Sequence, residues 1–232
     1  MAHRVSRHLR IEIDRYDETI RRFIPGYETM IRRAAEEIAR TSPSVVLDLG
    51  AGTGALSEKM LEHDAVGTVE LLDVDPEMLD RAKMRLVRFG DRARFAPRSY
   101  DEPFPACDAI AASLALHHIP ELRAKRELYA RAYAALRPGG VLVNADVNMP
   151  VENDRRDALY RGWADHLVAS GIPEVRAWRH FEEWAEEDTY FPFEDERAAL
   201  ESVGFRVCRV WSEGPMGVVV ASCKHPENAE KK

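Results

Sequence analysis

The sequence predicts an α/β protein built on a doubly wound, mostly parallel sheet. Short apolar runs, typical of strands buried on both faces, alternate with amphipathic helical patterns from residue 44 to residue 148. A glycine-rich turn, GAGTG at 50–54, follows the first of these runs. The 232 residues, 45% of them apolar, are enough for one domain with a full core.

The expected elements follow one another in a regular order. A helix over 11–22 ends before Pro25 and Gly26, which stop helices, and a second helix begins near Tyr27. Strands and helices then alternate, with strands at 44–50, 67–75, 92–99, 107–116 and 140–148 and helices at 54–63, 75–90 and 119–140. In the helix at 75–90, Asp75 can cap the amino end and Pro76 suits the first turn. Such alternation predicts parallel strands joined by helical crossovers.

Residues 150–193 interrupt this alternation. They are rich in Trp, Tyr and charged residues, and we expect a helical insertion over the carboxyl ends of the strands. A helix at 194–204 and an antiparallel hairpin at 205–224 should follow. We therefore predict a single domain over 1–232, with a helical lid at 1–40, this insertion at 150–193 and a disordered tail at 225–232.

Composition argues against several classes of protein. The net charge is −7 and residues 182–201 are strongly acidic, which argues against a nucleic-acid partner. Three scattered cysteines without a CxxC pair predict neither disulfides nor a zinc site, as in a reduced, cytoplasmic protein. No stretch approaches the ~20 apolar residues of a membrane span, and the first residues lack a signal-peptide pattern. We expect no membrane partner.

Two acidic positions beside the glycine-rich turn indicate the ligand. Ligands of open α/β sheets bind at the carboxyl ends of the strands, where glycines let them approach the backbone. Asp73, about twenty residues after the glycines, can accept both hydroxyls of a ribose. The spacing is GxGxG rather than GxGxxG, and Asp48 would lie badly beside a pyrophosphate but suits an amino group. A nucleoside that carries a cationic group at its other end fits, as S-adenosylmethionine does.

Four segments in succession resemble the motifs of class I S-adenosylmethionine-dependent methyltransferases. They are VLDLGAGTG, LLDVDPEML, YDEPFPACDAIAASLALHHIPE and LRPGGVLVNAD. The resemblance implies a Rossmann-like seven-stranded sheet of order 3-2-1-4-5-7-6, with the seventh strand antiparallel and helices on both faces. It also implies S-adenosylmethionine as the cofactor.

The same resemblance assigns cofactor-binding residues by position. The methionine and ribose parts would be bordered by Asp48, Gly50, Ala51, Gly52 and Gly54. Asp73 would bind the ribose hydroxyls, and the adenine would be flanked by Val74 and Met78. The floor beneath the sulfonium would be formed by Ser113 and Leu114.

One position departs from the family pattern. Many members place an aspartate against the adenine amine where this chain has Ser99. A serine hydroxyl can still hydrogen-bond that amine, and Tyr100 can cover the ring. Both are candidate adenine contacts.

The segment IPGYE is similar to the tRNA wobble-uridine carboxymethyltransferase branch, which uses a carboxylated form of the cofactor. In that branch the tyrosine of the matching PGY approaches the carboxylate end of the cofactor. The resemblance carries this role to Tyr27, whose alternative role is packing between helices.

Methyl transfer needs little chemistry from the protein beyond closeness and alignment. His117 follows the fourth strand and is the candidate general base, although a polar loop residue is the plainer interpretation. No metal site is expected. The favoured function is methyl transfer to a small-molecule acceptor. The alternative functions are a tRNA wobble-uridine carboxymethyltransferase-like enzyme, a nicotinamide-dependent oxidoreductase and a non-catalytic nucleoside-binding module. The sequence also leaves open whether the protein forms a homodimer.

Overall fold

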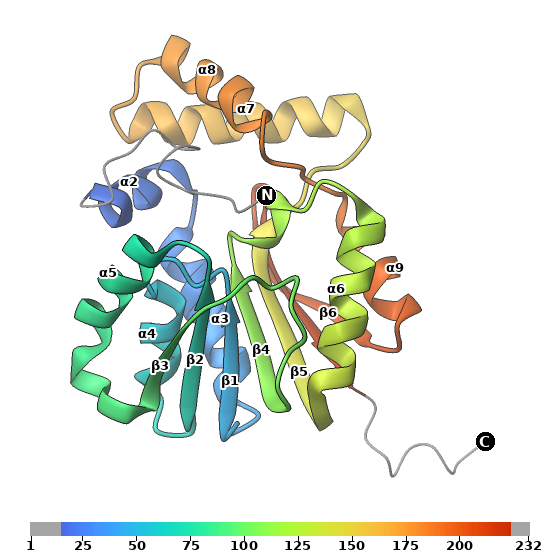
Figure 1. The fold of residues 1–232 in the computed structure, drawn as a ribbon. Coiled ribbons are helices and arrows are strands. Elements are labelled where there is room, and N and C mark those ends of the chain that lie inside the picture. The colour runs from blue at the N-terminus through green and yellow to red at the C-terminus, as the bar shows by residue number, and fades with distance from the viewer. Residues whose placement is uncertain (1–14, 224–232) are drawn as a thin grey trace.

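A computed structural model describes residues 15–223, and its centre is one seven-stranded sheet (Figure 1). The strand order is β3-β2-β1-β4-β5-β7-β6. Strands β1 to β5 are parallel, and β7 runs antiparallel to both of its neighbours. The strands are β1 (Val45–Leu49), β2 (Thr68–Asp73), β3 (Ala93–Pro97), β4 (Cys107–Ser113), β5 (Leu136–Val147), β6 (Arg206–Glu213) and β7 (Met216–Ser222). The predicted fold class and strand order are confirmed.

Helices cover both faces of the sheet because the central strands are apolar on both sides. In β1, Val46 packs into one core cluster while Leu47 and Leu49 pack into the other. The first face is covered by α3 (Tyr27–Ala39), α4 (Ala55–Leu61) and α5 (Pro76–Leu86), the second by α6 (Leu122–Ala135) and α9 (Phe193–Ser202). Asp75 caps α5 as predicted, since its side chain accepts the backbone N–H of Glu77 at 3.0 Å.

Three further helices lie beyond the carboxyl ends of the strands (Figure 1). They are α2 (Tyr16–Phe23) and the two helices of the insertion, α7 (Asn153–Ala169) and α8 (Glu174–Trp184). The indole N–H of Trp163 in α7 donates to the backbone carbonyl of Phe23 at 2.6 Å, which fastens the insertion to α2. Residues 1–14 of the expected lid and the expected tail at 225–232 lie outside the described residues.

Several boundaries around β4 and β5 differ from the prediction. The helix expected over 119–140 spans only Leu122–Ala135, and β5 begins at Leu136 instead of residue 140. Leu136 pairs with Cys107 ahead of a register shift in β4, so the chain is already extended before the glycines. The fourth strand ends at Ser113, and residues 116–118 form a short 3₁₀ turn instead of continuing the strand. Within residues 15–223, no helix is both long and apolar enough to cross a membrane.

Candidate active site

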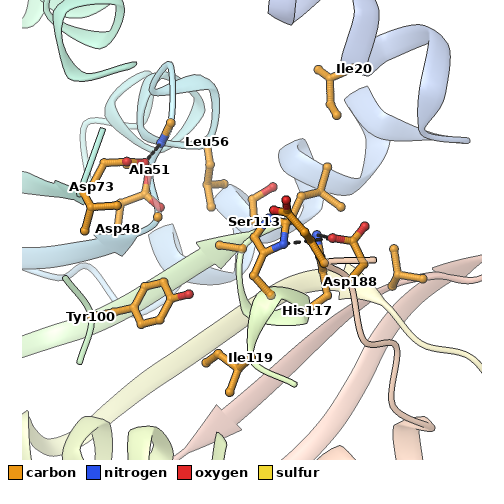
Figure 2. A pocket seen from close by; sticks show the side chains of 18 of the residues that line it. Ile20, Asp48, Ala51, Leu56, Asp73, Tyr100, Ser113, His117, Ile119 and Asp188 are labelled. Atoms are coloured by element: carbon orange, nitrogen blue, oxygen red, sulfur yellow. Dashed lines mark hydrogen bonds and ion pairs between the residues drawn. The ribbon is translucent and has the colours of Figure 1, made fainter. Parts of the chain in front are cut away.

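A cavity of about 1170 Å³ opens at the carboxyl ends of the strands. Its walls come from α2, the glycine-rich turn, the loops after β2, β3 and β4, and the insertion. Figure 2 shows two ends of this cavity, with Asp48, Ala51 and Asp73 at one end and His117 and Asp188 at the other. Ser113 lies between them. The cavity is large enough for a nucleoside cofactor together with a small second ligand.

The glycine-rich turn leaves its side of the cavity bare. Gly50 and Gly52 adopt positive φ angles of 63° and 53°, a conformation that side chains disfavour. A Cβ on Gly50 would lie 2.7 Å from the Cβ of Ala115, whereas one on Gly52 would meet nothing within 4 Å. The turn therefore packs closely on one side and leaves open space on the other, where a ligand can approach the backbone.

Asp73 ends β2 and holds the turn in place. Its two carboxylate oxygens accept the backbone N–H groups of Gly52 at 2.7 Å and Asp75 at 2.8 Å. Burial raises the pKa of this carboxyl, and the two backbone N–H donors oppose that rise. Because Asp73 also lines the cavity, its remaining lone pairs are available to ribose hydroxyls.

Asp48 is a buried carboxylate that lacks one partner. The hydroxyl of Ser57 donates to Oδ2 at 2.6 Å, but Oδ1 has no hydrogen-bond partner among the described residues. Burial, with Asp73 nearby, raises the pKa of Asp48 to about 7. A carboxylate in this position gains from a cation, and the ammonium of S-adenosylmethionine is one. The residues present thus fit the predicted cofactor.

The expected adenine contacts lie at the same end. Val74, Ser99 and Tyr100 all line the cavity, and burial raises the pKa of the Tyr100 hydroxyl to about 12. The Ser99 hydroxyl is 3.1 Å from a carboxylate oxygen of Asp101, to which it donates. Asp101, a cavity-lining carboxylate two residues after Ser99, was missed by our sequence analysis.

Two of the predicted cofactor residues lie elsewhere. Gly54 is not a lining residue, since its Cβ would point at Leu71, Ala82 and Leu86, each 3.2 Å away, behind the turn. Met78 has no exposed surface and belongs to the buried side of α5. By contrast, the remaining predicted residues line the cavity: Tyr27, Asp48, Gly50, Ala51, Gly52, Asp73, Val74, Ser99, Tyr100, Ser113, Leu114 and His117.

His117 lies between two carboxylates at the other end. Its Nδ1 is 2.5 Å from Asp146 Oδ1 in β5, and its Nε2 is 3.7 Å from Asp188 Oδ1 in the insertion. Tyr190 donates its hydroxyl to the other oxygen of Asp188 at 2.7 Å. Burial lowers the pKa of His117, but the two carboxylates outweigh it and the net shift is upward. Asp146 thus fixes the ring orientation and directs Nε2 toward Asp188 and the cavity.

His118 lies beside this group. Its Nδ1 is 3.0 Å from Asp188 Oδ1, and the donor atoms of His117, His118 and Asp188 all fall within 4.8 Å of one another. Two imidazoles and a carboxylate can bind a divalent cation. The hydrogen bonds and opposite charges already explain why His117, His118 and Asp188 lie together. That this site binds no metal stays a prediction.

Helix α2 is tied to the glycine-rich turn. Asp17 in α2 accepts a hydrogen bond from the Thr53 hydroxyl at 2.7 Å and forms an ion pair with Arg85 of α5. Arg85 also donates to the Thr53 hydroxyl at 3.2 Å. Tyr16, next to Asp17, lines the cavity together with Tyr27 at the start of α3. Burial raises the pKa values of both tyrosines, so their hydroxyls remain neutral donors at ordinary pH.

Comparison with known proteins identifies the class. Residues 47–142 match the family model of a methyltransferase domain. Residues 47–142 are thus similar to a methyltransferase domain, and this likeness supports the predicted class I S-adenosylmethionine-dependent methyltransferase and its cofactor.

Individual relatives extend beyond this domain to different degrees. An uncharacterized methyltransferase of Anoxybacillus flavithermus is 34% identical over 135 residues, 56% of this chain and 58% of its own length. The carboxy-S-adenosyl-L-methionine synthase of Pectobacterium atrosepticum is 26% identical over 207 residues, 85% of this chain and 83% of its own. An O-methyltransferase family protein of Burkholderia thailandensis has the same fold, with a TM-score of 0.67, 19% identity and coverage of 86% of this chain and 56% of that one. The chain spans 58 to 65% of the length of the first curated relatives.

Proposed function

We propose that this protein transfers a methyl group from S-adenosylmethionine to a small-molecule acceptor, with His117 as the proton acceptor. One observation carries the proposal: a single cavity joins the carboxylates of Asp48 and Asp73 to the imidazole of His117. The volume of about 1170 Å³ suits a cofactor and a compact acceptor better than a folded nucleic acid. The net charge of −7 also opposes phosphate binding.

At the cofactor end, this chain supplies charge and shape. Asp48 would hold the ammonium through Oδ1, and Asp73 would hold the ribose hydroxyls while keeping Gly52 in position. Ser113 and Leu114 would form the floor beneath the sulfur. When bound, S-adenosylmethionine supplies a methyl carbon made electrophilic by the sulfonium.

At the acceptor end, His117 would receive a proton at Nε2. Asp146 holds Nδ1 at 2.5 Å and thereby keeps Nε2 directed toward the cavity. A positioned base of this kind contributes roughly 10²–10⁴-fold to a rate when the acceptor must lose a proton. An acceptor that attacks without losing a proton would need alignment only.

The direct test uses the purified protein, methyl-labelled cofactor and a fractionated cell extract. Label in small molecules supports the proposal, while label in RNA or in protein contradicts it. With the acceptor found, His117→Ala should lower turnover by about a hundredfold and change cofactor affinity little. His63→Ala, outside the cavity, is the matched control and should leave both unchanged.

The raised pKa of His117 gives a second test. Imidazole accepts a proton only when it is neutral, so turnover should rise with pH through a pKa above the ordinary 6.5. Asp146→Asn removes the nearer carboxylate, which should move this rise to lower pH and reduce the maximum rate. A pH profile that is the same in both proteins would mean that His117 is not the base.

A second candidate function concerns a carboxylated cofactor. The carboxy-S-adenosyl-L-methionine synthase relative aligns with 85% of this chain. Tyr27 lines the cavity with a neutral hydroxyl that can donate to a carboxylate. Mass spectrometry of the cofactor released from the purified protein distinguishes the candidates, because a carboxylated cofactor is heavier by one CO₂.

A further inference from the structure

We propose that the acceptor is an amine, bound as its ammonium ion on an apolar or aromatic frame. This inference rests on the proposed methyl transfer and adds the chemical class of the second ligand. Three features of the acceptor end carry it: the sign of the charge around the cavity, the buried carboxylate of Asp188 and the aromatic walls.

Negative charge dominates the lining of the cavity. The acidic lining residues are Asp48, Asp73, Asp101, Glu186, Glu187 and Asp188. Arg98 is the one lining residue in the described chain with a permanent positive charge, and it lies with Ser99 beside the adenine end. Its guanidinium already donates to Glu102 at 3.3 Å and to the Pro103 carbonyl at 2.8 Å. Within residues 15–223, no lysine or arginine of the lining therefore faces the acceptor, and a carboxylate or phosphate acceptor would meet repulsion from the acidic residues.

Asp188 is the acid best placed to bind an ammonium. Its side chain is only 5% exposed, and it lines the cavity next to His117 and His118. The Tyr190 hydroxyl fixes one carboxylate oxygen at 2.7 Å. The other oxygen is 3.7 Å from His117 Nε2 and 3.0 Å from His118 Nδ1. An ammonium bound there would lie against both the carboxylate and the base.

Aromatic rings close the same end. Trp163 and Trp184 line the cavity with ring centroids 5.5 Å apart, and Tyr190 lies 6.1 Å from Trp163. Phe23 from α2 completes the group at 5.2 Å from Trp184. Ring faces attract cations, and the flat apolar surfaces suit an aromatic or alkyl frame. Rings and carboxylate together favour a cation over a neutral hydroxyl group.

The reaction of an amine balances with the groups present. The ammonium first loses a proton to His117 Nε2, which leaves a nitrogen lone pair. That lone pair forms the new N–C bond while the C–S bond breaks. The electron pair of the C–S bond stays on sulfur, which becomes a neutral thioether. The methylated amine keeps its positive charge or releases a second proton to solvent. No oxidant, reductant or metal is required.

Three probes that share one frame test the proposal: 2-phenylethylamine, 2-phenylethanol and phenylacetate. Binding of adenosylhomocysteine is measured first by calorimetry, and its failure would contradict the proposed function itself. With that ligand saturating, the amine should bind at least about tenfold more tightly than the alcohol, and phenylacetate most weakly. Equal or tighter binding of phenylacetate, or no detectable binding of the amine, would overturn the amine assignment alone.

The variant Asp188→Asn separates charge from shape. It should weaken binding of the amine by about tenfold and leave 2-phenylethanol unchanged. Glu182→Gln removes an exposed acid of the same insertion that does not line the cavity, so it should alter neither. An unchanged ratio of amine to alcohol affinity in Asp188→Asn would also overturn the proposal.

Discussion

Among single residues, Asp73 has two roles. Its side chain holds the glycine-rich turn in place, and it also faces the cavity. Asp73→Ala should weaken adenosylhomocysteine binding by about 1–3 kcal/mol, through the loss of charge-assisted hydrogen bonds. Calorimetry measures this directly. The matched control is Asp75→Ala, which removes the α5 cap and costs about 1 kcal/mol of stability but should not change affinity. If both variants lost the same affinity, the loss would come from local unfolding and not from the contacts of Asp73 with the ligand.

Asp48 should make cofactor binding depend on pH. Its pKa of about 7 means that the carboxylate is largely protonated at pH 6 and largely ionised at pH 8. If the ionised form holds the ammonium, affinity for adenosylhomocysteine should rise about tenfold over that range. In Asp48→Asn the rise should disappear, and 5′-methylthioadenosine, which lacks the amino group, should show none in either protein. A pH dependence that persists in Asp48→Asn would contradict the assignment.

The raised pKa of Asp48 should also make the stability of the unliganded protein depend on pH, in the direction opposite to cofactor affinity. Folded Asp48 keeps a proton that the unfolded chain releases near pH ~4. Its contribution to the free energy of unfolding therefore falls as pH rises from about 4 to about 7. Denaturant unfolding of the wild type should show this loss and Asp48→Asn should not, provided both are measured without ligand.

Sequence motifs located the cofactor end far better than the acceptor end. Asp48 and Asp73 were predictable because Asp48 is the penultimate residue of β1, just before the turn, and Asp73 ends β2, so local order fixes their position. Gly54 and Met78 belong to the same motifs but face the core, a distinction that depends on helix packing. Asp188 was predicted only as part of an acidic segment, because its approach to His117 depends on how the insertion folds back.

At the scale of elements, Asp17 links α2 to the glycine-rich turn and to α5. Asp17→Ala removes the hydrogen bond from Thr53 and the ion pair with Arg85, so α2 should open more easily. We expect cofactor to dissociate about tenfold faster, since hydrogen bonds to charged groups contribute about 1.5–3 kcal/mol. Stopped-flow displacement measures the rate. Glu18→Ala on the same helix removes, among residues 15–223, only an exposed pair with Arg15, and it should not change the dissociation rate.

Elements that have both a clear hydrophobic pattern and residues that stop the element were predicted well. The helix that Asp75 caps and the strand before the glycine-rich turn have such local signals. The start of β5 was wrong because Leu136 becomes extended by pairing with Cys107, and pairing between distant segments leaves no local pattern. By contrast, the insertion was expected over the carboxyl ends of the strands, where α7 and α8 lie, and contacts such as the hydrogen bond from Trp163 to Phe23 hold it there.

For the whole molecule, α2, the sheet and the insertion enclose one cavity, so a ligand in it should stabilise all three together. Adenosylhomocysteine at one hundred times its dissociation constant should add about 2.7 kcal/mol to the free energy of unfolding. For a chain of this size, the corresponding rise in melting temperature is about 5–10 °C.

NADH should produce no rise in melting temperature, because Asp48 opposes a pyrophosphate at the turn. Calorimetric melts with each ligand separate a methyltransferase from a nicotinamide-dependent oxidoreductase. Stabilisation by NADH without stabilisation by adenosylhomocysteine would reverse that choice.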